Sequence, residues 1–499
     1  MLGRQHNLTE RGGAGSHAQY LWWFVAIVMC LYIAALNGGP LYYYDSGGYL
    51  DNGSKALQEL GLWTAPASEQ APHSVQTAAG DGTVNGSRSL LYSLISAGFA
   101  LFVGATAVPL VHLGLILATV WLVARILVRE LPNMPMVGTV VGMSFLAAGL
   151  GALPFYVAYL MPDIFAGILI LLAAIMIAIP GRLTVFEALA MLALGLGAVL
   201  SHPSHLLLVA GLVLIALLVG LLVRQNYWWR PVLMLAAMAG GGVAERAAFT
   251  AVADKALDAE VFYYPFLTAR LIQDGVGYAQ LNATCPNEEK PTCKLHQALS
   301  LSDDPMRLTA SHIIFETAPH LASFRLLPAA DQKMVADAQV AFAVETLLDR
   351  PMGVIGAVVG NTLSQLRMFS IEMTIPEEDV IIGLQQIPNL PAGLVQQGGL
   401  KRSDGAWIAR VDRAHEIYYL LSLILVVGLA LWPGLLPKEL RLLVVVVALG
   451  LLGNAFICGA VSQPANRYGA RVIWLVPFVA ALLVSYVLGQ RAASKSKEL

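Results

Sequence analysis

Long apolar segments recur along the chain, and most polar residues gather in the turns between them. A helix needs roughly 20 mostly apolar residues to cross the hydrocarbon core of a membrane. Segments of about this length predict an all-α polytopic membrane protein with about ten membrane-spanning helices. The predicted spans are 21–37, 106–124, 135–153, 164–180, 184–200, 206–223, 231–250, 416–436, 441–461 and 472–488.

Two of these segments, 164–180 and 184–200, are short and are separated by a turn that contains Gly181 and Arg182. We interpret them as a tight cytoplasmic hairpin. The alternative is one buried re-entrant pair, which would change the number of crossings without changing the fold class.

The composition agrees with this pattern. Hydrophobic residues make up 57% of the 499 residues and charged residues only 12%, whereas soluble domains carry about 25% charged residues. The formal net charge is -2, so the overall charge gives no reason to expect a nucleic-acid partner.

Lysine and arginine are enriched in cytoplasmic loops. A cytoplasmic N-terminus places most basic flanks inside and leaves only Arg467 and Arg471 in short outer loops. Both termini, 1–19 and 489–499, are then cytoplasmic. The inside set is Arg4, Arg11, Arg125, Arg129, Arg182, Arg224, Arg230, Lys438, Arg441, Arg491, Lys495 and Lys497.

The first apolar segment has no convincing small-x-small cleavage site before Leu41, so we interpret it as a retained signal anchor.

Two long regions are predicted to lie outside the cytoplasm. One is the first outer loop, 38–105, within a transmembrane module over 20–250; its apolar end, LLYSLISAGFALF, suits an interfacial helix. The other is 251–415, of mixed or α-rich structure, which precedes C-terminal transmembrane helices in 416–488. Within it, 334–349 predicts an amphipathic helix and 351–369 a helix lying on or beside the membrane.

Four cysteines are present. Cys30 and Cys458 lie in predicted spans, whereas Cys285 and Cys293 lie in the external segment CPNEEKPTC. Disulfides persist in oxidising compartments. We therefore expect a disulfide between Cys285 and Cys293; the alternative is two free thiols in a surface loop.

Ionisable residues near membrane depth are expensive to keep and are functional by default. Here they converge on the outer ends of the predicted spans. Arginine forks bind phosphate bidentately, a nearby carboxylate can accept a proton from a hydroxyl, and histidine can bind phosphate or ligate a metal. The candidate site residues are Asp45, Arg88, Tyr92, Asp163, His202, His205, Arg467, Tyr468 and Arg471.

Four of these candidates also have a structural interpretation. Asp45 and Asp163 are placed to cap helices, and Arg467 and Arg471 could be snorkelling anchors. We expect Glu245 and Arg246, near the outer end of 231–250, to form an internal salt bridge.

Four short motifs occur in an order that resembles the GT-C superfamily of membrane glycosyltransferases, including protein O-mannosyltransferases and lipid A aminoarabinose transferases. The resemblance covers roughly 20–250 and 416–488. The motifs are YYYDSGGYL with Asp45, GSRSLLYSLI with Arg88 and Tyr92, LMPDIFAGILIL with Asp163, and NRYGARVIWLVPF with Arg467 and Tyr468.

The resemblance implies transfer of a sugar from a polyprenyl-phosphate donor to a hydroxyl of a glycan, lipid or protein acceptor. Asp45 would be the general base, Asp163 would support the active-site turn or a cation, and Arg467 and Tyr468 would lie near the donor phosphate. The chain departs from the family in two places. AVLSHPSHLLLV has histidines where the family often has a Lys-Gly-Pro turn, and Ser46 follows Asp45 where an Asp-Glu pair is usual. A divalent cation therefore stays an open possibility.

These features favour an enzyme in a bacterial inner membrane whose active face is periplasmic. Three other functions remain open. A lipid or solute transporter or flippase would also have intramembrane charges. An O-antigen ligase or polymerase shares the substrate class, and a non-catalytic assembly subunit would share the envelope location.

Overall fold

The computed structural model describes residues 14–64, 82–224 and 226–498. Arg4, Arg11 and most of the polar stretch 65–87 therefore lie outside the described residues. In the described part, helices dominate, and the two strands are three residues each. The predicted all-α fold class is confirmed at this level.

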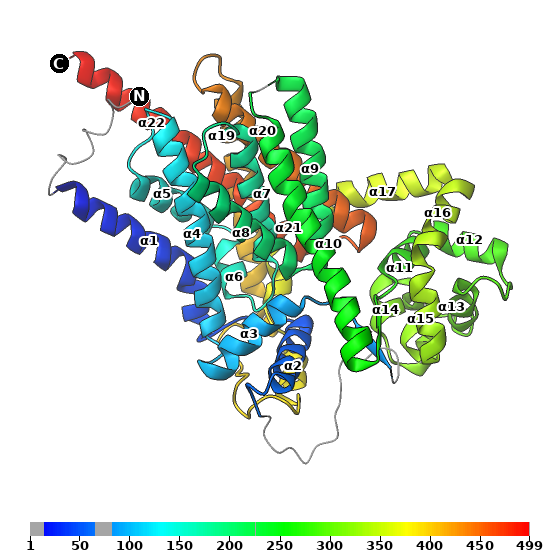
Figure 1. The fold of residues 1–499 in the computed structure, drawn as a ribbon. Helices are drawn as coiled ribbons and strands as arrows, with labels where there is room; N and C mark the ends of the chain where they lie inside the picture. The colour runs from blue at the N-terminus through cyan, green and yellow to red at the C-terminus, as the bar shows by residue number, and fades with distance from the viewer. Residues whose placement is uncertain (1–13, 65–81, 225, 499) are drawn as a thin grey trace.

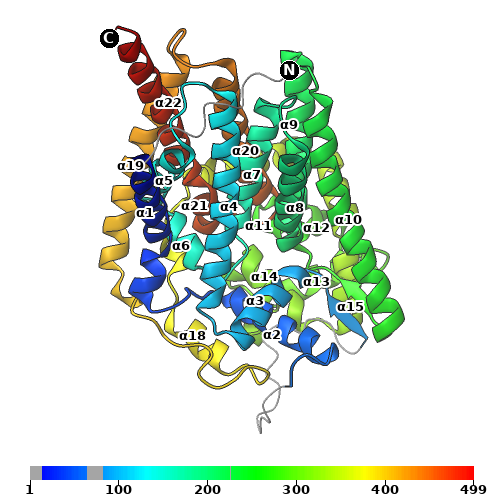
Figure 2. The same cartoon turned by 60° about the vertical axis from the view of Figure 1, so that its left-hand side comes forward.

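A bundle of mostly upright helices forms the larger part of the molecule (Figures 1 and 2). It is built from α1 (Ala14–Asn37), α4 (Ala107–Glu130), α5 (Val137–Gly149), α6 (Leu153–Ala158), α7 (Ile164–Ala178), α8 (Val185–Ser201), α9 (Pro203–Val223), α10 (Trp229–Leu257), α19 (Ala406–Leu431), α20 (Lys438–Val461), α21 (Asn466–Ile473) and α22 (Leu475–Glu498).

Seven helical stretches of the described chain are long and apolar enough to cross a membrane. Shorter apolar helices include α5, α7 and α8, each of which overlaps a predicted span. The seven stretches are Gln19–Asn37, Ala107–Glu130, Pro203–Val223, Trp229–Lys255, Ala406–Leu431, Lys438–Val461 and Asn466–Lys495.

Helix α7 lies at the centre of the bundle, and every one of its 15 residues is buried. It packs against α4, α8, α9 and α20, which explains why its sequence is apolar on all sides. A Cβ at Gly450 of α20 would come within 2.6 Å of Ile170 of α7. The missing side chain lets the two helices approach closely, as small residues do in membrane bundles.

The predicted span 135–153 is divided in the structure. Helix α5 ends at Gly149, and the short α6 begins at Leu153. Pro154, in the first turn of α6, has no N–H to donate to a preceding helical turn. The hydroxyl of Tyr419 accepts a hydrogen bond of 2.7 Å from the free N–H of Ala152. This interruption shapes the turn before Asp163.

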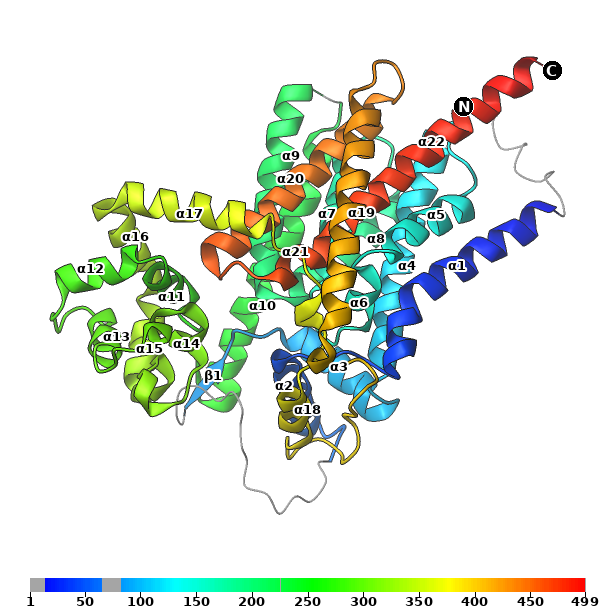
Figure 3. The same ribbon diagram turned by 180° about the vertical axis from the view of Figure 1, so that it is seen from behind.

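A separate group of short helices lies beside the bundle (Figures 1 and 3). It has its own apolar core, which includes Phe262, Leu281 and Phe324. It contains α11 (Phe266–Gln273), α12 (Val276–Thr284), α13 (Thr292–Leu299), α14 (Ala310–Phe315), α15 (Ala329–Asp337) and α16 (Gln339–Asp349), with 3₁₀ turns at Pro305–Leu308, Pro319–Leu321 and Phe324–Leu326.

Two predictions for this region can be compared with the structure. The disulfide between Cys285 and Cys293 is confirmed. The predicted helix 334–349 is interrupted, because α15 ends at Asp337 and α16 starts at Gln339. The boundaries of the region also shift, since α10 continues to Leu257 and α19 already begins at Ala406.

Helix α17 (Pro351–Gln365) runs across the bundle helices (Figures 1 and 3) and packs against α20. Its apolar side chains Met352, Ile355, Val359 and Leu363 are at least half exposed. On its other side, Asn361 donates to both oxygens of Asp274 at 3.0 and 3.1 Å. The segment is thus a helix with one apolar face, and its position on a membrane stays a prediction.

Helices α2 (Tyr44–Glu59), α3 (Leu90–Phe102) and α18 (Glu378–Gln385) gather at one end of the bundle (Figures 2 and 3). Strand β1 (Thr83–Asn85) pairs in parallel with β2 (Glu260–Phe262) and so joins the first loop to the chain that follows α10. The turns Glu372–Thr374 and Arg402–Asp404 lead to and from α18. We call this the Asp45 end.

Candidate functional site

Asp45 lies in the first turn of α2, where the helix dipole favours a negative charge. The chain just before it is held by main-chain hydrogen bonds of 2.8 Å between Leu41 and the segment Ala158–Leu160. The hydroxyl of Ser46 also donates to the carbonyl oxygen of Leu160 at 2.9 Å. These bonds bring Asp45 close to Asp163, although 118 positions separate them in the numbering.

Two arginines hold the Asp45 carboxylate. Arg88 Nη2 lies 2.9 Å from Asp45 Oδ1, and Arg467 Nη1 lies 3.2 Å from Asp45 Oδ2. The arginine side chains are only 9% and 6% exposed, whereas that of Asp45 is 25% exposed. Of Asp45, Arg88 and Arg467, Asp45 is therefore the residue that a ligand can approach most easily.

Aromatic rings fix the two guanidinium groups in place. Arg88 lies over the ring of Tyr49 at 5.3 Å, and Arg467 lies over Tyr43 at 4.8 Å and Tyr468 at 5.0 Å. Cation–π contacts of this kind are worth about 0.5–2 kcal/mol each. Only Tyr468 was selected from the sequence, although Tyr43 stands in the YYYD motif itself.

The surroundings of Asp45 act on its pKa in opposite directions. Burial raises the pKa, but the guanidinium groups of Arg88 and Arg467 together outweigh burial and lower it to about 2. Asp45 is therefore fully ionised near neutral pH, and a proton acceptor with so low a pKa is a weak base unless the arginines are drawn away.

Asp163 and Arg471 extend the charge cluster into the interior. Asp163 Oδ1 lies 3.6 Å from Arg467 Nε and 3.4 Å from Arg471 Nη1, and both Asp163 and Arg471 are almost fully buried. Arg471 also donates to Asn454 Oδ1 at 2.9 Å. Cationic and anionic side chains alternate in this cluster, in the order Arg88, Asp45, Arg467, Asp163 and Arg471. Three arginines and two aspartates give it a formal net charge of +1.

The backbone around Arg467 is anchored at several points. Tyr156 donates its hydroxyl to the carbonyl oxygen of Arg467 at 2.6 Å, and Asn454 donates to that of Tyr468 at 2.8 Å. Gln365 at the end of α17 exchanges two hydrogen bonds, of 3.0 and 2.9 Å, with the backbone of Ala465. The polar residues of α17 thus help to place α21.

The remaining candidates occupy different positions. His202 caps α9 by accepting from the N–H of Ser204 at 3.1 Å. His205 is buried, with Nδ1 2.7 Å from the carbonyl oxygen of Ala198, and Nε2 has no partner among the described residues. Tyr92 is also buried, with its hydroxyl 3.2 Å from His112 Nε2. Its ring packs edge-on against the ring of Tyr49, and Arg88 lies over that same Tyr49 ring.

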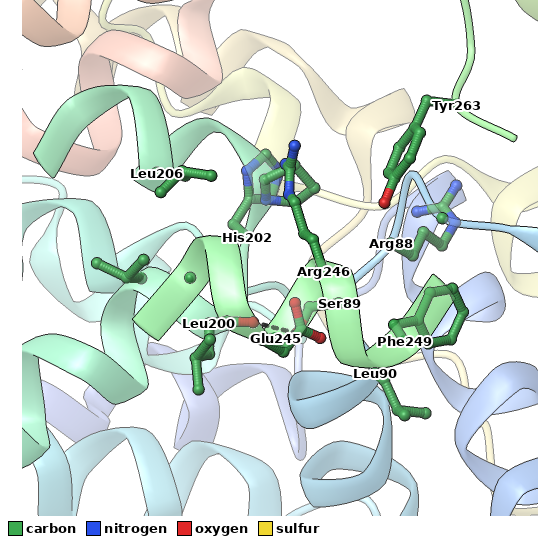
Figure 4. A pocket seen from close by; sticks show the side chains of 14 residues that line it. Arg88, Ser89, Leu90, Leu200, His202, Leu206, Glu245, Arg246, Phe249 and Tyr263 are labelled. Carbon is green, nitrogen blue, oxygen red and sulfur yellow. Dashed lines mark hydrogen bonds between the residues drawn. The ribbon is translucent and has the colours of Figure 1, made fainter. Parts of the chain in front are cut away.

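A small pocket lies between the start of α3, the end of α8, the start of α9 and the middle of α10, and Arg88 lines it (Figure 4). Its volume is about 30 Å³. The hydroxyl of Ser89 donates to the carbonyl oxygen of Leu200 and thereby joins the start of α3 to the end of α8 at this pocket. The lining residues are Gly86, Arg88, Ser89, Leu90, Val199, Leu200, His202, Pro203, Leu206, Gly242, Glu245, Arg246, Phe249 and Tyr263.

The expected salt bridge between Glu245 and Arg246 is wrong. Within the described residues neither side chain forms an ion pair, and Arg246 instead lies over the ring of Tyr263 at 5.4 Å. The Arg246 guanidinium thus contacts an aromatic ring in place of the expected carboxylate. Tyr263 and Phe249 had no distinguishing signal in the sequence.

Cation ligands do not cluster in the described part of the chain, where no group of three histidine, cysteine, aspartate or glutamate residues could hold a metal ion. Asp45 and Asp163, the two carboxylates of the site, are each bound to arginine instead. The described residues of this site therefore present no assembled set of ligands for the divalent cation that the sequence leaves open.

Comparisons with known proteins returned nothing: no family model, curated protein or solved structure matches the chain.

Proposed function

We propose that this protein is a GT-C-type membrane glycosyltransferase with about ten membrane crossings. It would transfer a sugar from a polyprenyl-phosphate donor to an acceptor hydroxyl on the periplasmic face of a bacterial inner membrane, with both termini cytoplasmic. The observation that carries this proposal is the partly exposed Asp45 carboxylate, held between the buried arginines Arg88 and Arg467 at one end of an apolar helix bundle.

The charges of the cluster support a phosphate-linked substrate. The donor phosphodiester carries one negative charge, and the five charged residues of the cluster sum to +1. A phosphate near Arg467 would attract a guanidinium group that now binds Asp45. Positive charge at this place would also stabilise the phosphate as it leaves, which is the largest catalytic effect in many enzymes.

In the proposed reaction, Asp45 accepts the proton of the acceptor hydroxyl as that oxygen attacks the anomeric carbon of the sugar. The bond between the anomeric carbon and the phosphate oxygen breaks, and its electron pair leaves with the polyprenyl phosphate. Asp45 then releases its proton to water. Loosening the contacts to Arg88 and Arg467 would raise the basicity of Asp45 at the moment when it is needed.

A transfer assay tests this proposal. Membranes that contain the wild-type protein or Asp45→Asn would be supplied with a panel of radiolabelled polyprenyl-phosphate sugars. Asn keeps the size of Asp but cannot accept the proton, so the rate should fall about 10²- to 10⁴-fold. Asp51→Asn is the matched control, because Asp51 lies on the same helix and binds Lys55 and Asn389 instead.

Two outcomes would reject parts of the proposal. If the wild-type protein transfers no sugar from any donor, the proposed activity is wrong. If wild type and Asp45→Asn transfer sugar equally fast, the activity stands but Asp45 is not the base.

A further inference from the structure

The first two thirds of helix α17 contain no polar side chain, although much of this stretch is exposed. Residues 351–360 read PMGVIGAVVG. The exposed fractions of Met352, Ile355 and Val359 are 77%, 50% and 52%. Leu348, just before them in the last turn of α16, is 75% exposed. Exposed apolar surface of this extent marks a contact with another molecule or with a membrane.

The contact between α17 and α20 shows at which level α17 leaves the bundle. A Cβ on Gly459 of α20 would lie 2.9 Å from the backbone of Asn361, so the two helices touch there. Gly459 is two positions before the end of α20 at Val461, and α20 is long and apolar enough to cross a membrane. In the proposed topology this is the outer end of α20. Helix α17 therefore meets the bundle at the outer edge of the hydrocarbon core.

Both ends of α17 are tied to the same side of the bundle. Arg350, the N-cap of α17, donates to the side-chain oxygen of Gln280 in α12 at 3.0 Å. Gln365, its last residue, is bound to the backbone of Ala465 in the turn between α20 and α21. With 15 residues, the helix is also shorter than the roughly 20 that a crossing needs. It thus lies along the membrane surface and not across the membrane.

The surroundings of α17 favour lipid as the molecule that covers it. The helix projects sideways from the bundle (Figures 1 and 3). In α20, against which it packs, Leu452 and Phe456 are 45% and 50% exposed, and Phe456 lies one turn from Gly459. The apolar surface of α17 therefore adjoins the lipid-facing side of a membrane helix. Residues 351–360 carry no charge, so acyl chains suit them better than anionic headgroups do.

We propose that α17 and the last turn of α16 lie in the outer leaflet of the membrane, where acyl chains cover residues 351–360 and Leu348. Such a helix lies about 5–10 Å deep, at the boundary between headgroups and acyl chains. It would anchor the group of short helices beside the Asp45 end. The inference goes beyond the proposed transferase activity and holds whichever reaction the Asp45 cluster performs. It also goes beyond the expectation for 351–369, because it assigns a depth and names the covering molecule.

The lipid contact is measured on the full-length protein in phosphatidylcholine nanodiscs, without any transfer assay. Val359→Cys is labelled with the environment-sensitive fluorophore NBD, and wild type, whose two free cysteines are buried, gives the background. The label should emit at a shorter wavelength than in water. Nitroxide lipids should quench it, more strongly with the nitroxide near the headgroup than with the nitroxide at the end of the acyl chain.

Leu301→Cys is the matched control. Leu301 is 82% exposed and follows α13 in the same group of short helices, and α13 packs against α12 and α15. Its label should emit as in water and escape quenching by both lipids. Ile355→Cys, one turn before Val359 on α17, should repeat the result of Val359→Cys.

Three results would overturn the inference. Labels at Val359 and Ile355 that emit and respond like the Leu301 label would mean that water covers α17. Stronger quenching by the deep nitroxide would place the helix inside the hydrocarbon core. Short-wavelength emission without quenching by either lipid would mean that protein, such as a second copy of this chain, covers the helix instead of lipid.

Discussion

The two ends of the helix bundle contain the same kinds of charged residue in different surroundings. At the end where α8 begins, Glu187 binds Arg129 and Arg125, and Glu130 binds Arg129 and Arg182. The three arginine side chains there are 33–54% exposed. At the Asp45 end, Arg88, Arg467 and Arg471 are 9% exposed or less.

The two clusters also differ in how the chain assembles them. Glu187 completes a capping box with Thr184 at the start of its own helix, and Glu130 follows Arg129 directly. The Asp45 cluster instead draws its charges from four segments that are far apart in the sequence. Exposed arginines at helix ends fit a role in membrane orientation, whereas buried arginines must be paired to be tolerated at all.

Removing a carboxylate from the buried cluster should have the largest effect on stability. Asp163→Ala leaves Arg471 buried without its anionic partner, and breaking a buried ion pair costs about 3–5 kcal/mol. Thermal unfolding in detergent should show a clear loss of stability. A melting temperature close to that of wild type would mean that the Asp45 end is no more dependent on its ion pairs than the other end.

A substitution at Gln365 tests whether α17 stabilises the Asp45 end. Gln365→Leu leaves the buried N–H and carbonyl groups of Ala465 without partners, which costs about 1–3 kcal/mol for a buried polar group. The unfolding free energy should fall by about this amount. Leu363→Ala, on the exposed face of the same helix, is the control and should change the unfolding free energy little.

The lowered pKa of Asp45 predicts a pH dependence. Because its folded-state pKa is about 2, against 3.8 for an unperturbed aspartate, ionised Asp45 stabilises the folded state above about pH 4, and this contribution disappears as the pH falls towards 2. It amounts to at most about 2 kcal/mol. The stability difference between wild type and Asp45→Asn should thus be constant between pH 7 and about pH 5 and should shrink below pH 4. A difference that does not change with pH would contradict the lowered pKa.

The smallest effect is expected at the opposite end of the bundle. Glu130→Gln removes the contacts of Glu130 with Arg129 and Arg182, whose side chains are 33% and 54% exposed. Exposed ion pairs are worth about 0–1 kcal/mol, so the melting temperature should barely change. A loss as large as that of Asp163→Ala would remove the distinction between the two ends.

The amino-acid sequence by itself determined the features that depend on local pattern. Apolar segments of membrane length predicted the helices, and all ten segments overlap helices of the structure. Cys285 and Cys293, eight positions apart, predicted the disulfide. The apolar helices depend on the solvent around each segment, and the disulfide depends on the compartment around its loop. The composition of a short segment indicates each of these surroundings directly.

The partners of the charged residues were decided only by the tertiary structure. Asp45, Arg88 and Arg467 were each visible as candidates, but the sequence could not show that the carboxylate binds both arginines or that Asp163 and Arg471 pair behind them. The adjacent Glu245 and Arg246 were expected to pair and do not. Ion pairs require specific side-chain directions, and between distant segments these are set by main-chain contacts such as that of Leu41 with Leu160.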